Sequence, residues 1–180
     1  MLDILHQDHI NISRLLDVLR DKLAALRSEK TVRFDLLKDA LSYLSEVSDT
    51  RHHPREDLIY EYYVTYRCSD PTSVTSMLKD QHKLIVASGE ELREMVDMIL
   101  MDAVIPLDHV ATALERFIVL QQHHLDYEET TVFPLLRLAL TEDDWRHLEH
   151  NWVHMTGDDP LFGRQVAERY HDLATQLLSA

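Results

Sequence analysis

Cysteine is almost missing from this sequence, which contains a single one, Cys68. One thiol cannot form an internal disulfide or build a cysteine-rich zinc site, so a reducing compartment is favoured. The sequence also has no apolar run that approaches the length of a membrane span. The charged, histidine-containing segment at its start is unlike a signal peptide. We therefore expect a cytoplasmic protein with no membrane partner.

Glycine and proline are scarce as well, with three and five residues in a chain of 180. That scarcity, together with abundant Leu, Ala, Glu and Asp, predicts long helices joined by short turns rather than many strands. A chain of this length can bury one core well and is short for two. We predict a single all-α domain over residues 1–180, with a bundle at about 2–139 and a helical extension at about 141–180.

Positive charge is in short supply, with 18 Lys and Arg against 32 Asp and Glu and a formal net charge of −14. No run of Lys or Arg could serve as a phosphate-binding stripe, which argues against nucleic acid as a partner. An acidic surface attracts cations, although it also serves solubility.

Apolar residues recur three or four positions apart in four long segments, as one face of a helix requires. The first covers about residues 2–28, and the second runs from the turn at 28–32 to about Tyr63. The third covers about 74–101, and the fourth runs from Pro106 to about Leu135. Four long helices with short connections predict an up-down-up-down four-helix bundle.

The connections carry typical signals. Pro54 lacks an N–H and clashes with the preceding turn, so a bend or restart is expected near it. The sequence CSDPTS (68–73) is typical of a turn in which Ser69 or Thr72 caps the next helix. TEDDW (141–145) predicts a short N-capped helix, DDPLFG (158–163) a loop, and the remaining residues a C-terminal helix.

Polar residues interrupt the four apolar stripes. His9 and His82 each stand where a Leu is expected, and the second and fourth segments each carry His-x-x-x-Glu on the inward face, a spacing that aligns both side chains. HHPRED (52–57) and HLDYEE (124–129) share this pattern, and the lone histidines precede the paired ones by 43 and 42 residues. The two halves therefore look like copies of one helical hairpin. The predicted metal ligands are His9, His52, Glu56, His82, His124 and Glu128.

The residue types indicate the metal. Imidazole and carboxylate without thiolate suit iron, manganese or zinc, and two carboxylates among four histidines suggest two ions bridged by carboxylate. A single inward histidine is more often a hydrogen-bonded core residue, and His-x-x-x-Glu is common on helix surfaces. Six such residues on four stripes, arranged as a repeat, favour the metal interpretation. Two buried glutamates without a metal would also be costly.

Three neighbours are less certain ligands: His53, Asp57 and His123. At about 3.6 residues per turn, His53 lies half a turn from its stripe and His123 lies about 100° from His124. They, and His6, could instead hydrogen-bond a ligating carboxylate or fix a tautomer. Other histidines are expected at the surface or at helix ends, and three aromatic residues around the site: His109, His147, His150, His154 and His171; Tyr60, Tyr63 and Phe133.

The sequence resembles the hemerythrin-like family, the HHE cation-binding domains, over nearly its whole length. The resemblance rests on QDH (7–9), HHPRED, QH (81–82) and HLDYEETTVFP (124–134), and DDW (143–145) and DPLFG (159–163) are similar to a bacterial branch. It implies a non-haem di-iron centre inside a four-helix bundle, with the six residues as ligands.

The sequence departs from oxygen-carrying members of that family in two places. They have a fifth histidine where Val86 stands here, and their last carboxylate follows its histidine by five residues, which would select Glu129. The symmetric set is more similar to bacterial iron-centre repair proteins, whose short Cys-containing N-terminal domain is not found in this sequence.

Several functions remain open. The first is a two-iron module, bridged by oxygen or carboxylate, that binds O₂ or NO for sensing, storage or scavenging; manganese or zinc would also fit. The alternatives are an enzyme that reduces NO or peroxide, iron-centre repair or iron donation, and a structural or regulatory bundle. The sequence has no flavin or nicotinamide fingerprint and no Cys-x-x-Cys to supply electrons. A ferritin-like site would need Glu-x-x-His on two bundle helices, the reverse of the order found. The redox partner is unknown, and a homodimer is left open.

Overall fold

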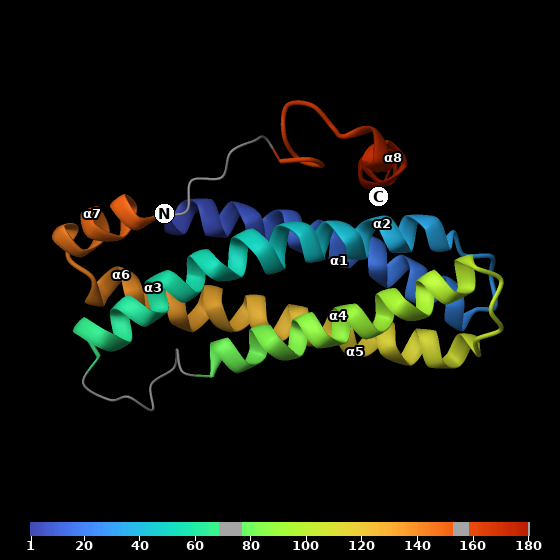
Figure 1. The fold of residues 1–180 in the computed structure, drawn as a ribbon, viewed down its shortest axis with the longest axis horizontal. Helices are drawn as coiled ribbons and strands as arrows, with labels where there is room; N and C mark the ends of the chain where they lie inside the picture. Colours follow the sequence, from blue (N-terminus) through green and yellow to red (C-terminus); the bar gives the residue numbers. More distant parts are fainter. Residues whose placement is uncertain (69–76, 153–158, 180) are drawn as a thin grey trace.

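The computed structural model describes residues 1–68, 77–152 and 159–179, and within these ranges all regular structure is helical. Four antiparallel rods form the body (Figure 1). Rods 1 and 3 are single helices, and rods 2 and 4 each contain a π-helical segment. The rods comprise α1 (Leu2–Arg27); α2 (Phe34–Leu44), η1 (Ser45–His52) and α3 (His53–Tyr66); α4 (Leu78–Leu100); and α5 (Leu107–Tyr127), η2 (Glu128–Val132) and α6 (Phe133–Ala139).

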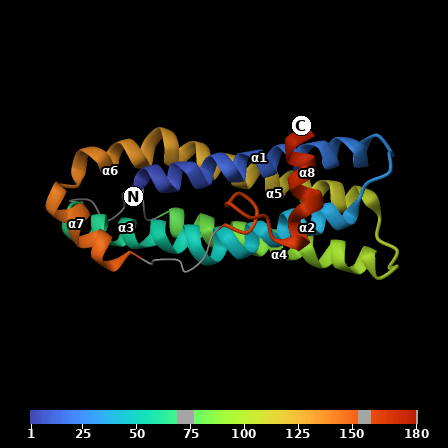
Figure 2. The same ribbon diagram turned by 90° about the horizontal axis from the view of Figure 1, so that it is seen from above.

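The predicted up-down-up-down bundle is confirmed, and short helices follow it. These are α7 (Glu142–Asn151), the 3₁₀ turn η3 (Glu168–Tyr170) and α8 (His171–Ser179). Seen from above, α8 crosses α1 and α2, whereas α7 lies near the other end of the bundle beside α3 (Figure 2). The predicted caps Ser69 and Thr72, and also His154, lie outside the described residues.

Rods 1 and 3 end in the same way. Just past α1, Glu29 adopts a left-handed conformation with φ of 53°, and the Lys30 N–H bonds back to the carbonyl of Ala25. Just past α4, Asp102 does the same with φ of 63°. This left-handed ending satisfies carbonyls that the helix leaves unpaired. The repeat seen in the sequence therefore extends to the turns that reverse the chain.

The two π-helical segments each end beside a proline. The N–H of His53 bonds to the carbonyl of Ser48, and Pro54 follows; the N–H of Phe133 bonds to the carbonyl of Glu128, and Pro134 follows. Proline has no N–H and crowds the turn before it, so a wider turn accommodates it. Rod 2 thus changes its helix type just before Pro54, where the sequence predicted a bend or a restart.

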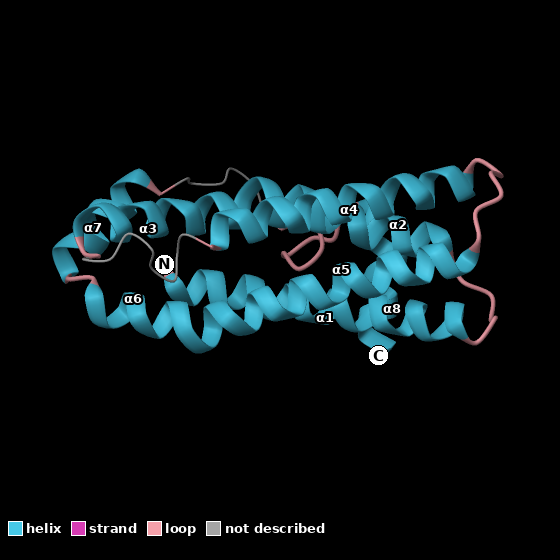
Figure 3. Cartoon of the chain, turned by 90° about the horizontal axis from the view of Figure 1, so that it is seen from below, coloured by secondary structure: helices cyan, strands magenta, loops and turns pink. Residues whose placement is uncertain are grey.

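Polar side chains divide the interior into two apolar clusters. In α1, His9 lies between Leu5 of one cluster and Ile12 of the other; in α4, His82 lies between Leu78 and Ile85 in the same way. His9 and His82 thus lie at the same level along the bundle. Figure 3 shows the rods packed lengthwise beside one another. None of the helices in the described ranges combines the length and apolar character of a membrane span.

Asp144 attaches α7 to the bundle. Its side chain and that of Thr141 form a reciprocal N-terminal cap, which confirms the capped helix predicted at 141–145. The same carboxylate accepts hydrogen bonds from Tyr62 at 2.7 Å and from Arg67 at 2.7 and 2.8 Å. Leu148 and Trp152 continue the contact into the apolar cluster that contains Tyr60.

Acid should release α7 from α3. The guanidinium of Arg67 holds the pKa of Asp144 well below its usual range. A depressed pKa contributes stability above the unfolded value of about 3.9, and that stability is lost as the pH falls through the folded pKa. The sequence has two tryptophans, Trp145 and Trp152, both on or directly after α7, so tryptophan fluorescence in an acid titration reports the release.

The Asp144→Asn variant should show weaker α7 docking already at neutral pH and should lack the acid transition. Asp143→Asn, which removes an exposed carboxylate paired with Arg146, is the matched control and should behave as the wild type. An acid transition of unchanged midpoint in Asp144→Asn would contradict this role.

Candidate metal centre

The centre lies where the four rods bring histidine and glutamate to the same depth. The first of two donor groups contains His9, His52, Glu56 and Glu128, whose ligand atoms all lie within 4.8 Å of one another, and all four residues are buried. The Nε2 atoms of His9 and His52 are 3.0 Å apart. Glu56 Oε1 lies 3.3 Å from the first and 3.0 Å from the second. Four donors from three rods thus surround one point.

The second group contains His53, Glu56, His82 and His124, again buried and within 4.8 Å of one another. His53 and His82 are stacked, with ring centroids 4.1 Å apart, and His124 lies edge-on to His82 at 4.7 Å. Glu56 belongs to both groups, with Oε1 toward His9 and His52 and Oε2 at 3.5 Å from His82 Nε2. A carboxylate placed in this way can bridge two ions.

The donor spacing fits metal coordination. Bonds of about 2.1 Å place neighbouring ligand atoms roughly 3.0–3.4 Å apart in tetrahedral or octahedral geometry. The shortest donor separations, 3.0 to 3.5 Å, match this. Several of the atoms that face inward have no hydrogen-bond partner: Glu56 Oε2, His82 Nε2, His124 Nε2 and Glu128 Oε2. Buried polar atoms are normally paired, so a cation would satisfy what the protein leaves unsatisfied.

Without a bound ion, the neighbouring carboxylates raise the pKa values of three of the histidines. Burial alone would lower the pKa of His9, but the neighbouring carboxylates of Glu128, Glu129 and Glu56 outweigh it and raise the pKa to about 11. In the same way the pKa values of His52 and His82 rise to about 8 and about 9, because nearby carboxylates outweigh burial. The pKa of His53 is instead lowered by burial and by neighbouring histidines, which keeps it neutral. Burial also lowers the pKa of His124, so His9, His52 and His82 favour the protonated form and His53 and His124 the neutral one.

An oxygen atom lies behind each imidazole. Nδ1 of His9 donates to Glu129 at 2.7 Å, Nδ1 of His52 to Asp8 at 3.2 Å, and Nδ1 of His124 to Gln81 at 3.1 Å. For His82 and His53 the nearest carboxylates are Asp57, at 3.2 Å, and Asp49, at 3.5 Å. The hydrogen bonds made by His9, His52 and His124 fix the tautomer that leaves Nε2 free for a metal and orient the ring.

These supporting residues follow the repeat. Asp8 precedes His9 and Gln81 precedes His82, and each backs the paired histidine of its own half. The residues after the two glutamates, Asp57 and Glu129, each back the lone histidine of the other half. The repeat could have revealed these residues, because the sequence places them at equal offsets. Their partners required the tertiary structure.

His53, one of the less certain ligands, is predicted half a turn from its stripe, whereas the structure turns it toward the centre. Its side chain is only 4% exposed and it belongs to the second donor group. The prediction assumed 3.6 residues per turn, whereas η1 is wider and rotates the residues beyond it, so both His52 and His53 face the centre. Its counterpart in the second half, 72 residues later, is Leu125, so His53 breaks the repeat.

The other uncertain residues separate clearly. Glu129 contacts Nδ1 of His9 and of His6, and it belongs to neither donor group found in the described ranges. Glu128 belongs to the first donor group. His123 is exposed, and Asp57 lies behind His82.

The aromatic residues predicted around the site are buried: Tyr60, Tyr63 and Phe133. Tyr60 also donates a hydrogen bond to Glu128 Oε1 at 2.7 Å, and Phe133 stacks on His9 at 5.1 Å. The histidines predicted at the surface are exposed where described: His109, His147, His150 and His171.

A family model described as the hemerythrin HHE cation-binding domain matches residues 1–136. The chain belongs to the hemerythrin family. No curated protein matches the sequence. The match ends inside α6, and α7 and α8 lie beyond the matched residues. The family and the two donor groups together make this hemerythrin a metal-binding protein.

Glu56→Gln should weaken metal binding at both donor groups, because Glu56 belongs to both. We expect a loss greater than the roughly 10–100-fold that removing an outer hydrogen-bond partner causes. Glu129→Ala removes such a partner of His9 and should weaken metal affinity by about that much at the first donor group, with the metal content at saturation unchanged. The metal content per chain and chelator competition measure both effects.

His123→Ala is the matched control, because this exposed imidazole lies next to His124 in the sequence but outside both groups. It should bind as the wild type does. Equal losses in Glu56→Gln and His123→Ala would contradict the site.

Proposed function

We propose that this hemerythrin holds two iron ions and binds O₂ or NO at them, for sensing, storage or scavenging. The observation that carries the proposal is that Glu56 belongs to two donor groups whose inward atoms lie at coordination spacing. The proposed ligands are the six predicted residues and His53, which adds a third imidazole to the second group: His9, His52, His53, Glu56, His82, His124 and Glu128. Nitrogen and oxygen donors without thiolate suit iron, and also manganese or zinc.

The protein residues have distinct roles in this proposal. Glu56 and Glu128 would hold the two ions at a fixed separation, and Tyr60 orients Glu128 through its hydrogen bond. The apolar clusters on either side exclude water from the layer between them. Iron bound here would supply open coordination positions and the capacity to exchange electrons with a diatomic ligand.

A groove gives a small ligand access to the second donor group. It encloses about 400 Å³ between α3 and α4 and is lined by His53 and His82. Pro54, Val86 and Ala87 make part of the lining apolar, which suits small ligands of low polarity such as O₂ and NO. Charged side chains line the rest of the groove: Asp49, Asp57, Lys79, Lys83 and Glu90. We assign this groove as the route by which the ligand reaches the centre.

Anaerobic reconstitution with Fe(II) tests the proposal. About two irons per chain should bind, and exposure to O₂ or NO should produce a new absorption band in the near-ultraviolet or visible range. Steady turnover with an added reductant would instead favour the enzyme that reduces NO or peroxide. Saturation at one iron, or two irons with no spectral response to either gas, would reject the proposed function.

Ala87→Trp should slow ligand binding without changing the iron content, because the larger side chain fills the groove. We expect a decrease of roughly tenfold in the association rate, equivalent to about 1.4 kcal/mol in the barrier, measured by stopped-flow absorbance. Leu84→Trp, on the same helix at a side chain 58% exposed and outside the groove, is the control. Unaltered kinetics in Ala87→Trp would mean that the ligand enters elsewhere.

A further inference from the structure

The C-terminal extension reaches the metal centre through a line of side chains. Trp152, directly after α7, lies with its ring centroid 5.1 Å from the guanidinium carbon of Arg55. Nη1 of Arg55 lies 3.9 Å from Oδ2 of Asp8. The same Oδ2 accepts the hydrogen bond from Nδ1 of His52 at 3.2 Å. The family match ends at residue 136, so Trp152 belongs to a part of the chain that the family model does not match.

The contacts are shielded from water. Trp152 is 7% exposed, and the side chains of Arg55 and Asp8 are 11% and 22% exposed. A guanidinium held between an aromatic face and a carboxylate gains from both, and these attractions strengthen as water is excluded. Arg55 is therefore fixed on one side by a ring and on the other by the carboxylate that supports His52.

The second half of the bundle lacks this arrangement. The counterpart of Asp8 is Gln81, a neutral amide that supports His124, and the counterpart of Arg55, 72 residues later, is Tyr127. A neutral acceptor needs no counter-ion, whereas a partly buried carboxylate is stabilised by one. The carboxylate of Asp8 and the guanidinium of Arg55 therefore occur together, in the half that carries His52.

We propose that Arg55, held in place by Trp152, is a positioning residue for His52: it fixes the Asp8 carboxylate behind the imidazole and so sets how tightly Nε2 binds its ion. The inference rests on the ligand role proposed for His52. Without Arg55, the Asp8 carboxylate can turn toward solvent, and the ring loses the partner that orients it. The C-terminal extension thereby tunes one of the two metal positions.

Zinc binding to the full chain provides the first test. Chelator competition with Zn²⁺ should show two ions bound to the wild type. In Arg55→Met and Trp152→Leu, one ion should bind about tenfold more weakly, as for the loss of an outer partner, and the other should be unaffected. Arg55→Lys, which keeps the charge, should recover part of the loss.

A second readout needs no metal. In histidine-labelled protein, the ¹⁵N–¹H signal of the His52 Nδ1–H group should shift in Arg55→Met and in Trp152→Leu, while the corresponding signal of His124 stays in place. A general loosening of the structure would move both signals.

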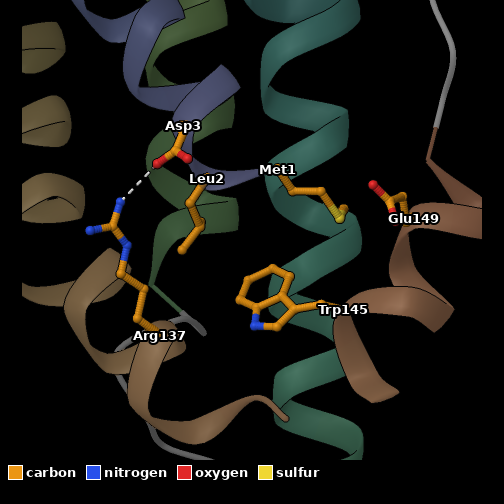
Figure 4. Close-up of a pocket in the computed structure, with 6 residues that line it drawn as sticks. All are labelled: Met1, Leu2, Asp3, Arg137, Trp145 and Glu149. Atoms are coloured by element: carbon orange, nitrogen blue, oxygen red, sulfur yellow. Dashed lines mark hydrogen bonds and ion pairs between the residues drawn. The ribbon is translucent and has the colours of Figure 1, made fainter. Parts of the chain in front are cut away.

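Two control variants test whether the effects come from the contact between Trp152 and Arg55 or from any change nearby. Trp145→Leu removes the tryptophan on α7 itself, which lines a pocket of about 240 Å³ together with Met1, Leu2, Asp3, Arg137 and Glu149 (Figure 4). Arg51→Met removes a cation close enough to repel Arg55. Both controls should leave the His52 signal and the zinc affinities as in the wild type.

An unmoved His52 signal in Arg55→Met would overturn the inference, as would a loss in Trp145→Leu equal to that in Trp152→Leu. Failure of the wild type to bind two zinc ions would instead count against the proposed function. The His52 signal would still decide the role of Arg55 in that case, because it is measured on the protein without metal.

Discussion

Two carboxylates at the centre of an apolar bundle set the requirements for the rest of the structure. Glu56 and Glu128 are fully buried, and charged groups in such surroundings are strongly unfavourable unless positive charge accompanies them. The imidazoles supply it as protonated rings or share it with a cation, as the raised pKa of His9 indicates. Each rod must therefore present a polar residue at one depth, and the apolar clusters must close on both sides of that layer.

The two halves of the bundle supply this polar layer with nearly the same pattern of residues, and they differ at a few positions. The halves agree in the lone histidine, the His-x-x-x-Glu pair, the supporting oxygen atoms and the left-handed residue that ends rods 1 and 3. They differ where His53 faces the centre and Leu125 takes the equivalent position. One donor group is consequently richer in nitrogen and the other in oxygen. Two ions held here would meet different chemical surroundings.

Much of this could be predicted from the sequence, because it depends on periodicity. The four rods follow from apolar spacing in a chain with few glycines and prolines, and the inward His and Glu stand out as exceptions to the stripes. His53 could not be placed in this way, since the count of 3.6 residues per turn fails in η1. The choice between Glu128 and Glu129 also depended on the fold, because only three-dimensional contacts show that Glu129 supports His9 from behind.

The π-helical segment of rod 2 makes the centre sensitive to insertions. A π-helical turn holds one residue more than an α-helical turn, so loss of one residue between Ser45 and Thr50 would let the rod relax to α-helical pitch with the faces on both sides unchanged. Insertion of one further residue there would instead turn everything downstream by about 100°, and His52, His53 and Glu56 would leave the interior together. A change of a single codon could thus remove three donors at once while the bundle itself survives, a route by which relatives of such a fold could lose the metal and keep the architecture.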